Sequence, residues 1–258
     1  MNVKKLFDLT GRVAVVTGGA GIYGTPISEA LAEAGAHVII ASRNLKKCEE
    51  FARQLIGKGL KASGESFDQS DEKLILDFHK RISDKFGFVD VLVNNSVART
   101  MSSFDDTLEN WRKSMAVNCD GVFAISRVFL NSMMEKGSGS IINIGSIQGV
   151  VAPDFNNYKG TDMKTAPDYH FHKHGLVGLT KYLAAMGGPK NVRVNIISPG
   201  GFFTGTQKEP FLSQYCRRVF LGRMAEHDDI KGTIVLLASD ASRYLTGQNI
   251  IIDGGYTC

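Results

Sequence analysis

The sequence predicts an α/β fold with one doubly wound parallel sheet and helices on both of its faces. Short β-branched runs alternate with longer helical patterns, and a glycine-rich turn follows the first of these runs. This alternation indicates βαβ units, whose right-handed crossovers place helices on both faces of a parallel sheet. No linker rich in proline, glycine and serine divides the chain, so residues 1–258 are predicted to form a single domain.

The amino-terminal part of the predicted sheet consists of two strand–helix pairs. Residues 13–17 read Val-Ala-Val-Val-Thr, a buried strand, and residues 27–34 form the helix after it. Residues 37–41 form the second strand, and residues 45–56 form a helix with one charged and one apolar face. The remaining strands are short β-branched runs at residues 89–93, 140–144, 192–197 and 249–252.

Two irregular segments interrupt the alternation. Residues 152–167 include Pro153, two adjacent asparagines and Gly160, and long loops inside compact domains often have a function. Residues 205–211 are a second segment for which we expect mobility. We therefore expect a substrate loop at about residues 151–167 and a lid at about residues 201–216.

Composition and charge favour a globular enzyme over a nucleic-acid-binding or membrane-spanning protein. Hydrophobic residues make up 43% of the chain, and its net charge is only +4. No apolar run approaches the roughly 20 residues that span a bilayer. The cysteines are scattered without a Cys-x-x-Cys pair, which argues against a zinc site and a disulfide framework. We expect a cytoplasmic protein without nucleic-acid or membrane partners.

A glycine-rich turn follows the first predicted strand. Residues 17–24 read Thr-Gly-Gly-Ala-Gly-Ile-Tyr-Gly, in which Gly19, Gly21 and Gly24 have GxGxxG spacing. A strand before and a helix after this spacing are the context of a Rossmann-type dinucleotide site. The glycines allow backbone to approach the pyrophosphate, and helix-terminal amides face the anion. The alternative is a plain turn between strand and helix.

The residues after the second strand bear on which dinucleotide is bound. An acidic residue there would accept hydrogen bonds from a ribose 2′-hydroxyl, but this chain has Ser42 and Arg43. Arg43 can pair with a 2′-phosphate, with Ser42 as a further donor. We therefore expect NADP(H) in preference to NAD(H). The alternative is that Arg43 simply faces water at the start of the next helix.

Together with later motifs, this pattern resembles the short-chain dehydrogenase/reductase family over nearly the whole chain. The turn departs from the family pattern at Ile22, which stands at the family's middle glycine. Asp68 resembles the adenine-contacting acid, Asn95 lies in a segment similar to Asn-Asn-Ala-Gly, and residues 199–204 resemble the segment that holds the nicotinamide carboxamide. The residues expected to bind cofactor are Gly18, Gly19, Gly21, Ile22, Gly24, Ser42, Arg43, Asp68, Asn95, Pro199, Gly200, Phe202 and Thr204.

The same resemblance implies a catalytic tetrad of Asn118, Ser146, Tyr169 and Lys173. Tyr169 and Lys173 are four residues apart, which puts both side chains on one helical face. Tyr158 lies closer to the usual distance from Ser146, but Asp162, not lysine, stands four residues after it. Accepting Tyr169 implies about ten extra residues between serine and tyrosine, which places Tyr158 in an insertion.

The residue types fit proton exchange at a carbon–oxygen bond. A phenol titrates near pH 10 in water, and a neighbouring cation favours its ionised form. Tyr169 would exchange the hydroxyl proton, Ser146 would hydrogen-bond the reacting oxygen, and Lys173 would also hold the nicotinamide ribose. Asn118 would anchor a water through which protons leave. The family resemblance implies these roles, and the cofactor carries the hydride.

Three histidines, His170, His172 and His174, raise the alternative of a metal site. His170 and His174 share a helix face, but no carboxylate pattern completes a ligand set, and the implied reaction needs no metal. We therefore expect no metal. Two of the three histidines are expected to lie at the rim of the pocket.

The sequence predicts only the chemical class of the substrate, not its identity. The insertion and residues 199–207 resemble gluconate 5-dehydrogenase-like and surface-glycan-pathway members, which implies a sugar acid, polyol or sugar derivative. Its hydrogen bonds would come from Gln148, Asn156, Asn157, Thr161 and Gln207. The alternatives are a non-catalytic nucleotide-binding regulator or scaffold, and an acyl-carrier reductase. The family resemblance also implies a homotetramer, formed through helical stretches at residues 114–134 and 166–186 and the last strand.

Overall fold

Seven parallel strands form one sheet in the computed structural model, which describes residues 2–258 and leaves Met1 outside the described residues. The strand order is β3-β2-β1-β4-β5-β6-β7. The order reverses beside β1, and ligands of such sheets bind at this point, outside the carboxyl ends of the strands. The strands are β1 (Val13–Thr17), β2 (His37–Ser42), β3 (Ala62–Ser66), β4 (Val91–Asn94), β5 (Gly139–Ile144), β6 (Val192–Pro199) and β7 (Asn249–Ile252).

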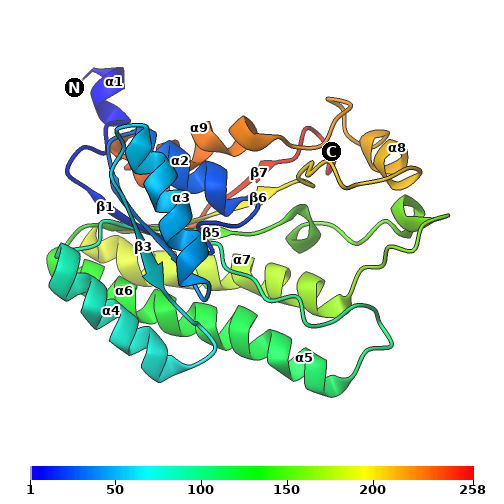
Figure 1. Cartoon of the computed structure of the whole chain (residues 1–258), viewed down its shortest axis with the longest axis horizontal. Coiled ribbons are helices and arrows are strands. Elements are labelled where there is room, and N and C mark those ends of the chain that lie inside the picture. The colour runs from blue at the N-terminus through cyan, green and yellow to red at the C-terminus, as the bar shows by residue number, and fades with distance from the viewer. Residues whose placement is uncertain (1) are drawn as a thin grey trace.

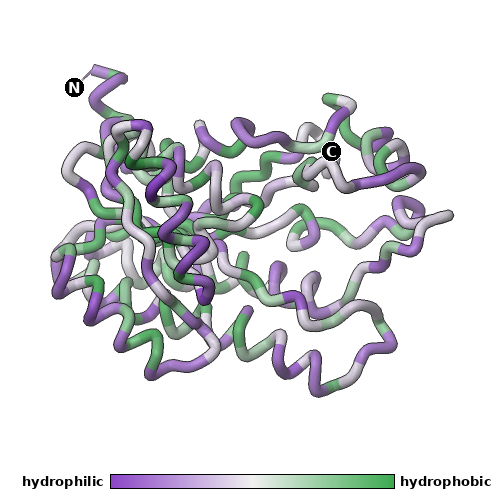
Figure 2. The backbone as a smooth tube through the Cα atoms, in the orientation of Figure 1, coloured by the Kyte–Doolittle hydropathy of each residue, from purple (hydrophilic) through white to green (hydrophobic). Residues whose placement is uncertain are grey.

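Helices cover both faces of the sheet, as the sequence predicted (Figure 1). Successive strand side chains point to opposite faces, so Val16 belongs to the core under α2, α3 and α9, whereas Val15 belongs to the core under α4, α6 and α7. Figure 2 shows hydrophobic segments along the central strands and hydrophilic stretches on the outer helices. The helices are α1 (Val3–Leu6), α2 (Gly24–Glu33), α3 (Leu45–Gly57), α4 (Glu72–Phe86), α5 (Leu108–Met115), α6 (Val122–Lys136), α7 (Pro167–Gly187), α8 (Phe211–Cys216) and α9 (Lys231–Ala238).

The structure adds two features to the predicted elements. The edge strand β3 reads Ala-Ser-Gly-Glu-Ser, and it lacks the β-branched run that marked the other strands. The long helix expected at residues 114–134 is interrupted by a π-helix at Ala116–Gly121, between α5 and α6. Such π-helical turns often occur at functional sites, and this one carries Asn118.

The two irregular segments meet beyond the carboxyl ends of the strands. Residues 150–166 contain only one short 3₁₀ helix, Phe155–Tyr158, and they pack against α8 and the carboxyl terminus. Figure 1 shows this segment and α8 together, away from the sheet. Within residues 2–258, no helix combines the length and the apolar character needed to cross a membrane.

Candidate active site

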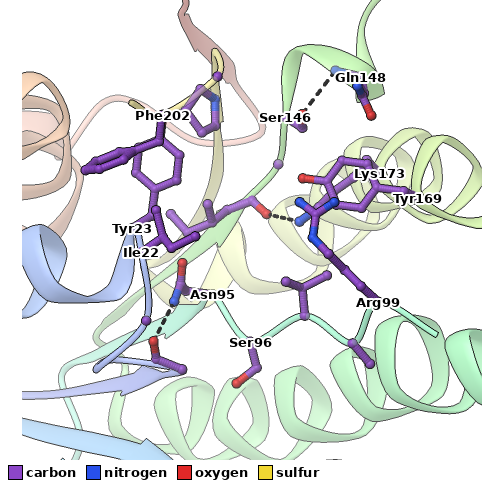
Figure 3. Close-up of a pocket in the computed structure, with 18 of the residues that line it drawn as sticks. Ile22, Tyr23, Asn95, Ser96, Arg99, Ser146, Gln148, Tyr169, Lys173 and Phe202 are labelled. Atoms are coloured by element: carbon purple, nitrogen blue, oxygen red, sulfur yellow. Dashed lines mark hydrogen bonds between the residues drawn. The ribbon is translucent and has the colours of Figure 1, made fainter. Parts of the chain in front are cut away.

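A cavity of about 600 Å³ lies at the carboxyl ends of the strands (Figure 3). Arg43 and Asp68, which follow β2 and β3, line one end, and Tyr169 of α7 lines the other. Most of the predicted site residues line this cavity: Gly18, Gly21, Ile22, Ser42, Arg43, Asp68, Asn95, Ser146, Tyr169, Lys173, Pro199, Gly200, Phe202 and Thr204. Three others, Gly19, Gly24 and Asn118, lie outside its lining.

The glycine turn needs a left-handed backbone at Gly18 and leaves no room for a side chain at Gly24. Gly18 has a φ of +62°, and its amide donates a hydrogen bond to the Ala41 carbonyl at 2.7 Å. A Cβ on Gly24, the first residue of α2, would lie 2.0 Å from the Gly18 oxygen. Ile22 fits the turn without strain, because its φ is not positive and its side chain is 60% exposed. Within residues 2–258, Asn191 is the only non-glycine residue with a positive φ.

Asn95 connects the end of β4 to this turn. Its Nδ2 donates hydrogen bonds to the carbonyl oxygens of Thr17 and Gly18, each at 3.0 Å. The backbone amides of Asn95 and Ser96 both donate to Thr17 Oγ1. The two strands on either side of the sheet reversal are therefore fixed to one another at the cavity wall, as the dashed line in Figure 3 illustrates.

The opposite end of the cavity from Tyr169 carries groups suited to a nucleotide. Arg43 is exposed, and no carboxylate pairs with it among residues 2–258. Ser42 Oγ lies 3.0 Å from Cys48 Sγ, and burial raises the pKa of that thiol. Asp68 accepts a hydrogen bond from the Ser70 amide at 3.0 Å. A glycine cradle with a cation beyond it fits a dinucleotide that carries an additional phosphate.

Tyr169 and Lys173 lie on one face of α7, as their spacing predicted. The Lys173 side chain is 94% buried, and its Nζ donates a hydrogen bond to the Ile144 carbonyl at 2.6 Å. Burial is the main reason why the pKa of this ammonium is lowered, and Tyr169 opposes that shift. Nζ lies 5.5 Å from the centre of the Tyr169 ring. The hydrogen bond to Ile144 therefore holds the Lys173 ammonium close to the Tyr169 ring.

Ser146 lies at the end of β5, facing the same part of the cavity. Its Oγ accepts a hydrogen bond from the Gln148 amide at 3.1 Å and caps the short helix Ile147–Gly149. Because the hydroxyl oxygen accepts this bond, its proton can point toward a ligand in the cavity. The labelled side chains of Ser146, Tyr169 and Lys173 converge in Figure 3.

Asn118 is buried behind the cavity wall rather than in it. Its Oδ1 accepts a hydrogen bond from the Ala98 amide, and its Nδ2 donates to the Ala98 carbonyl and to Ser114 Oγ. Ser114 in turn donates to Asp168 Oδ2 at 2.5 Å. Asp168 directly precedes Tyr169, so this chain of hydrogen bonds joins the π-helix to the first turn of α7.

Arg99 is a cavity residue that the sequence pattern did not reveal. Its guanidinium carbon lies 4.4 Å from the centre of the Tyr169 ring, on which it stacks (Figure 3). The guanidinium is exposed, and no ion pair to it is found within the described residues. Arg99 stands four residues after Asn95 and belongs to no motif with a characteristic spacing, so the sequence alone did not predict a role for it. Only the path of the loop after β4 brings it to the phenol.

The polar residues expected to bind substrate separate into two groups. Gln148 and Gln207 line the cavity, although the Gln207 amide also bonds to the Phe202 carbonyl. The expectation was wrong for the other three, which lie outside the cavity lining. Asn156 bonds to Asp154, buried Asn157 donates to Tyr256 Oη, and Thr161 donates to the Tyr158 carbonyl. Tyr158 itself lines the cavity.

The three histidines of α7 lie outside the cavity lining. His172 is 96% buried, its Nε2 has no hydrogen-bond partner, and burial lowers its pKa to about 3. It is therefore neutral at physiological pH. His170 bonds to Thr165, and His174 donates to the His170 carbonyl. Residues 2–258 contain no cluster of three or more potential metal-ligating side chains.

A family model described as enoyl-(acyl carrier protein) reductase matches residues 18–257, which is most of the chain. The chain belongs to the short-chain dehydrogenase/reductase family. This membership confirms the predicted family, and it makes the protein an NAD(P)-dependent oxidoreductase that acts on hydroxyl or carbonyl groups. The description is that of the family model, and the curated relatives of the chain include dehydrogenases of several substrate classes.

Two curated relatives and one solved structure illustrate this range. The chain is 34% identical to D-threitol dehydrogenase from Mycolicibacterium smegmatis over 97% of this chain and 95% of the relative. It is 30% identical to 7alpha-hydroxysteroid dehydrogenase from Bacteroides fragilis, with 95% and 94% covered. A gluconate 5-dehydrogenase from Burkholderia cenocepacia, solved with NADP and tartrate, superposes with a TM-score of 0.90 at 30% identity and 99% coverage of both chains.

Proposed function

We propose that the protein is an NADP(H)-dependent dehydrogenase that interconverts a secondary alcohol and a ketone on a sugar acid, a polyol or a related sugar derivative. One observation carries this proposal. A single cavity is lined at one end by Tyr169, Ser146 and the buried ammonium of Lys173, and at the other by the exposed guanidinium of Arg43. Proton exchange and nucleotide binding are thereby supported at the two ends of one continuous space.

The proposed roles of the residues follow from their positions. A bound nicotinamide dinucleotide supplies the hydride in reduction and accepts it in oxidation. Tyr169 Oη takes the hydroxyl proton of the substrate in oxidation and returns it in reduction, while the Ser146 hydroxyl donates a hydrogen bond to the reacting oxygen. Lys173, fixed on the Ile144 carbonyl, favours the ionised phenol. Asn118 fixes Ala98 and thereby the cavity wall that continues to Arg99.

The dinucleotide is proposed to lie along the glycine turn and the carboxyl ends of the strands. The close approach of Gly18 and Gly24 provides the cradle for the pyrophosphate, and residues 199–204 provide the wall beside the nicotinamide. Arg43, with Ser42, is proposed to bind a 2′-phosphate, which favours NADP(H) over NAD(H). The NADP named in the gluconate 5-dehydrogenase structure supports this choice.

The charges at the catalytic end favour a sugar acid within the proposed substrate class. Lys173 and Arg99 line this end, whereas the only carboxylate lining the cavity within the described residues, Asp68, follows β3 at the nucleotide end. A cavity lined by one sign of charge attracts the opposite sign. D-threitol dehydrogenase and gluconate 5-dehydrogenase, named among the similar proteins, support polyols and sugar acids in general.

A reductase of acyl-carrier-bound substrates is the second candidate, because the matching family model is described by such an activity. The relatives reported above carry enzyme names, and none of them supports the alternative of a non-catalytic regulator. A steroid dehydrogenase is also among them. The two rival substrate classes are therefore included in the experiment below.

Further parts of the proposal concern loops, assembly and location. Residues 151–167 are proposed as the substrate loop, and residues 201–216 are proposed as a lid over the cavity. We propose that the protein is located in the cytoplasm. We also propose that it forms a homotetramer, in which α6, α7 and β7 face neighbouring copies. Exposed Tyr182 and Met186 on α7 and partly exposed Ile251 on β7 support these faces. Native mass spectrometry tests the assembly, and a monomer at micromolar concentration contradicts it.

The experiment is a spectrophotometric panel at 340 nm. NADP⁺ and NAD⁺ are each combined with D-gluconate, D-threitol, a hydroxysteroid and a 3-hydroxyacyl thioester. We expect the highest kcat/KM with NADP⁺ and a polyhydroxylated substrate. Activity confined to the steroid or the thioester would overturn the substrate class, and turnover with NAD⁺ alone would overturn the cofactor preference.

A further inference from the structure

The insertion between Ser146 and Tyr169 is tied to α8 and the carboxyl terminus at three points. Asp154 Oδ2 pairs with Arg218 Nη1 at 2.7 Å, and the carboxylate is largely shielded from water. Buried Asn157 donates to Tyr256 Oη at 2.7 Å. The Lys159 carbonyl accepts from Gln214 Nε2 at 3.0 Å. The segment is therefore held in a defined place over the cavity instead of forming a loose loop.

These attachments fix Tyr158, which lies between them in the sequence. Its ring packs on the Phe211 ring, with centroids 5.7 Å apart, and against the cluster that contains Tyr215 and Met224. The Tyr158 carbonyl accepts a hydrogen bond from Thr161 Oγ1 at 2.9 Å. With the ring and backbone held, Tyr158 lines the same cavity as Tyr169.

The environment of Tyr158 makes it a hydroxyl donor and not a base. Burial is the main reason why its pKa is raised, and hydrogen bonding to Thr165 and Gln148 only partly opposes the shift. No lysine accompanies it in the way that Lys173 accompanies Tyr169 within the described residues. Tyr158 is therefore protonated near neutral pH and can both donate and accept hydrogen bonds.

Gln148 supplies a second polar group at the same end of the cavity. Figure 3 shows its side chain beyond Ser146, above the Tyr169 ring. Its backbone amide is used by Ser146, and the side chain lines the cavity beside Tyr158. An amide and a phenol hydroxyl placed together, next to the reacting groups, match the alternating donors and acceptors of a polyhydroxylated carbon chain.

We propose that Tyr158 is a specificity-determining residue, which with Gln148 binds substrate hydroxyl groups beyond the reacting carbon. This inference rests on the proposed function. The insertion would then select polyhydroxylated substrates, because its ion pair and hydrogen bonds to α8 and the carboxyl-terminal part of the chain set the position of Tyr158. A partly buried phenol and amide of this kind discriminate against a substrate without the matching hydroxyl, because the water that such a substrate displaces is not replaced by an equivalent hydrogen bond.

The test measures how strongly the enzyme prefers D-gluconate to 3-hydroxybutyrate, an acid without hydroxyls beyond the reacting one. Tyr158→Phe keeps the ring on Phe211 and removes only the hydroxyl. We expect the ratio of the two kcat/KM values to fall about 5- to 10-fold, through a higher KM for D-gluconate. The Kd of NADPH is expected to stay unchanged. Tyr244→Phe is the matched control, because Tyr244 is fully exposed, and it should leave the ratio unchanged.

Asp154→Asn provides a second variant that leaves the cavity lining intact. It weakens the pair with Arg218, and it should lower the same ratio by a smaller factor. An unchanged ratio in Tyr158→Phe overturns the inference and leaves the proposed function standing. Loss of turnover on both acids overturns it as well, since Tyr158 would then act at the reacting carbon. A wild-type enzyme without preference for D-gluconate or D-threitol over 3-hydroxybutyrate overturns the proposed function itself, and the inference with it.

Discussion

Replacing Gly24 by alanine tests the cradle proposed for the dinucleotide. The added Cβ would lie 2.0 Å from the Gly18 oxygen and 2.8 Å from two backbone atoms of Gly19. Since Cβ contacts below 3.0 Å are essentially never found, the turn and the start of α2 must separate by about 1 Å. Both partners are backbone, so no side-chain rotation can relieve the contact.

The expected magnitude follows from the size of this displacement. Overpacking of this kind costs about 1–3 kcal/mol, and each 1.4 kcal/mol or so that is lost from dinucleotide binding raises the Kd about tenfold. We expect the Kd of NADPH to rise about 10- to 100-fold. The midpoint of thermal unfolding should fall by roughly 2–10 °C for a chain of this size.

The assay combines calorimetric titration with NADPH and thermal unfolding followed by circular dichroism. Gly57→Ala is the matched control, because a Cβ at that helical position meets no atom within 4 Å and the backbone φ is not positive. It should leave the Kd unchanged. If Gly24→Ala bound NADPH as tightly as the wild type, the proposed close approach of the pyrophosphate to this turn would be refuted.

Three further predictions concern the proton-exchanging phenol, the cofactor phosphate and acid stability. Tyr169→Phe should lower kcat by about 10²- to 10⁴-fold and leave the Kd of NADPH within about twofold, because the ring that stacks on Arg99 remains. Arg43→Leu should weaken NADPH binding about 10- to 100-fold, measured by calorimetry, with little effect on NADH, since only NADPH carries the 2′-phosphate. The buried His172 has a folded-state pKa of about 3, below its ordinary value of 6.5, so the unfolded chain binds an additional proton between these values. The free energy of unfolding should therefore fall as the pH drops from 6.5 toward 3, by at most about 1.4 kcal/mol per pH unit from this group. Urea denaturation at pH 7 and pH 5 measures this fall, and the free energy of unfolding of His172→Leu should decrease less between the two pH values than that of the wild type.

Each of these predictions has a clear contrary result. Turnover retained in Tyr169→Phe but lost in Tyr158→Phe would move the proton exchange to the inserted tyrosine. Equal losses of NADPH and NADH affinity in Arg43→Leu would remove the proposed 2′-phosphate contact. A pH dependence of His172→Leu as steep as that of the wild type would mean that other buried groups, such as His79 with its lowered pKa, dominate the acid response.

The strands and the catalytic pair could be predicted because their signals are local. The central strands are buried on both faces, so runs such as residues 13–17 are almost continuously β-branched. The four-residue spacing of Tyr169 and Lys173 places them on one helical face regardless of the rest of the fold. The glycine turn was recognisable because strand and helix flank it directly. The edge strand β3 escaped prediction because its small polar residues carry no such pattern.

The position of the insertion was decided only by the tertiary structure. Asp154 pairs with a residue 64 positions away, and Asn157 bonds to one 99 positions away. No local periodicity encodes such contacts, so the sequence could not tell that Asn157 is used internally while Tyr158 reaches the cavity. Arg99 is a similar case, since its stacking on Tyr169 depends on the path of the loop after β4. The sequence by itself determined the sheet, the nucleotide turn and the tyrosine–lysine pair, whereas long-range packing decided which side chains surround the substrate end of the cavity.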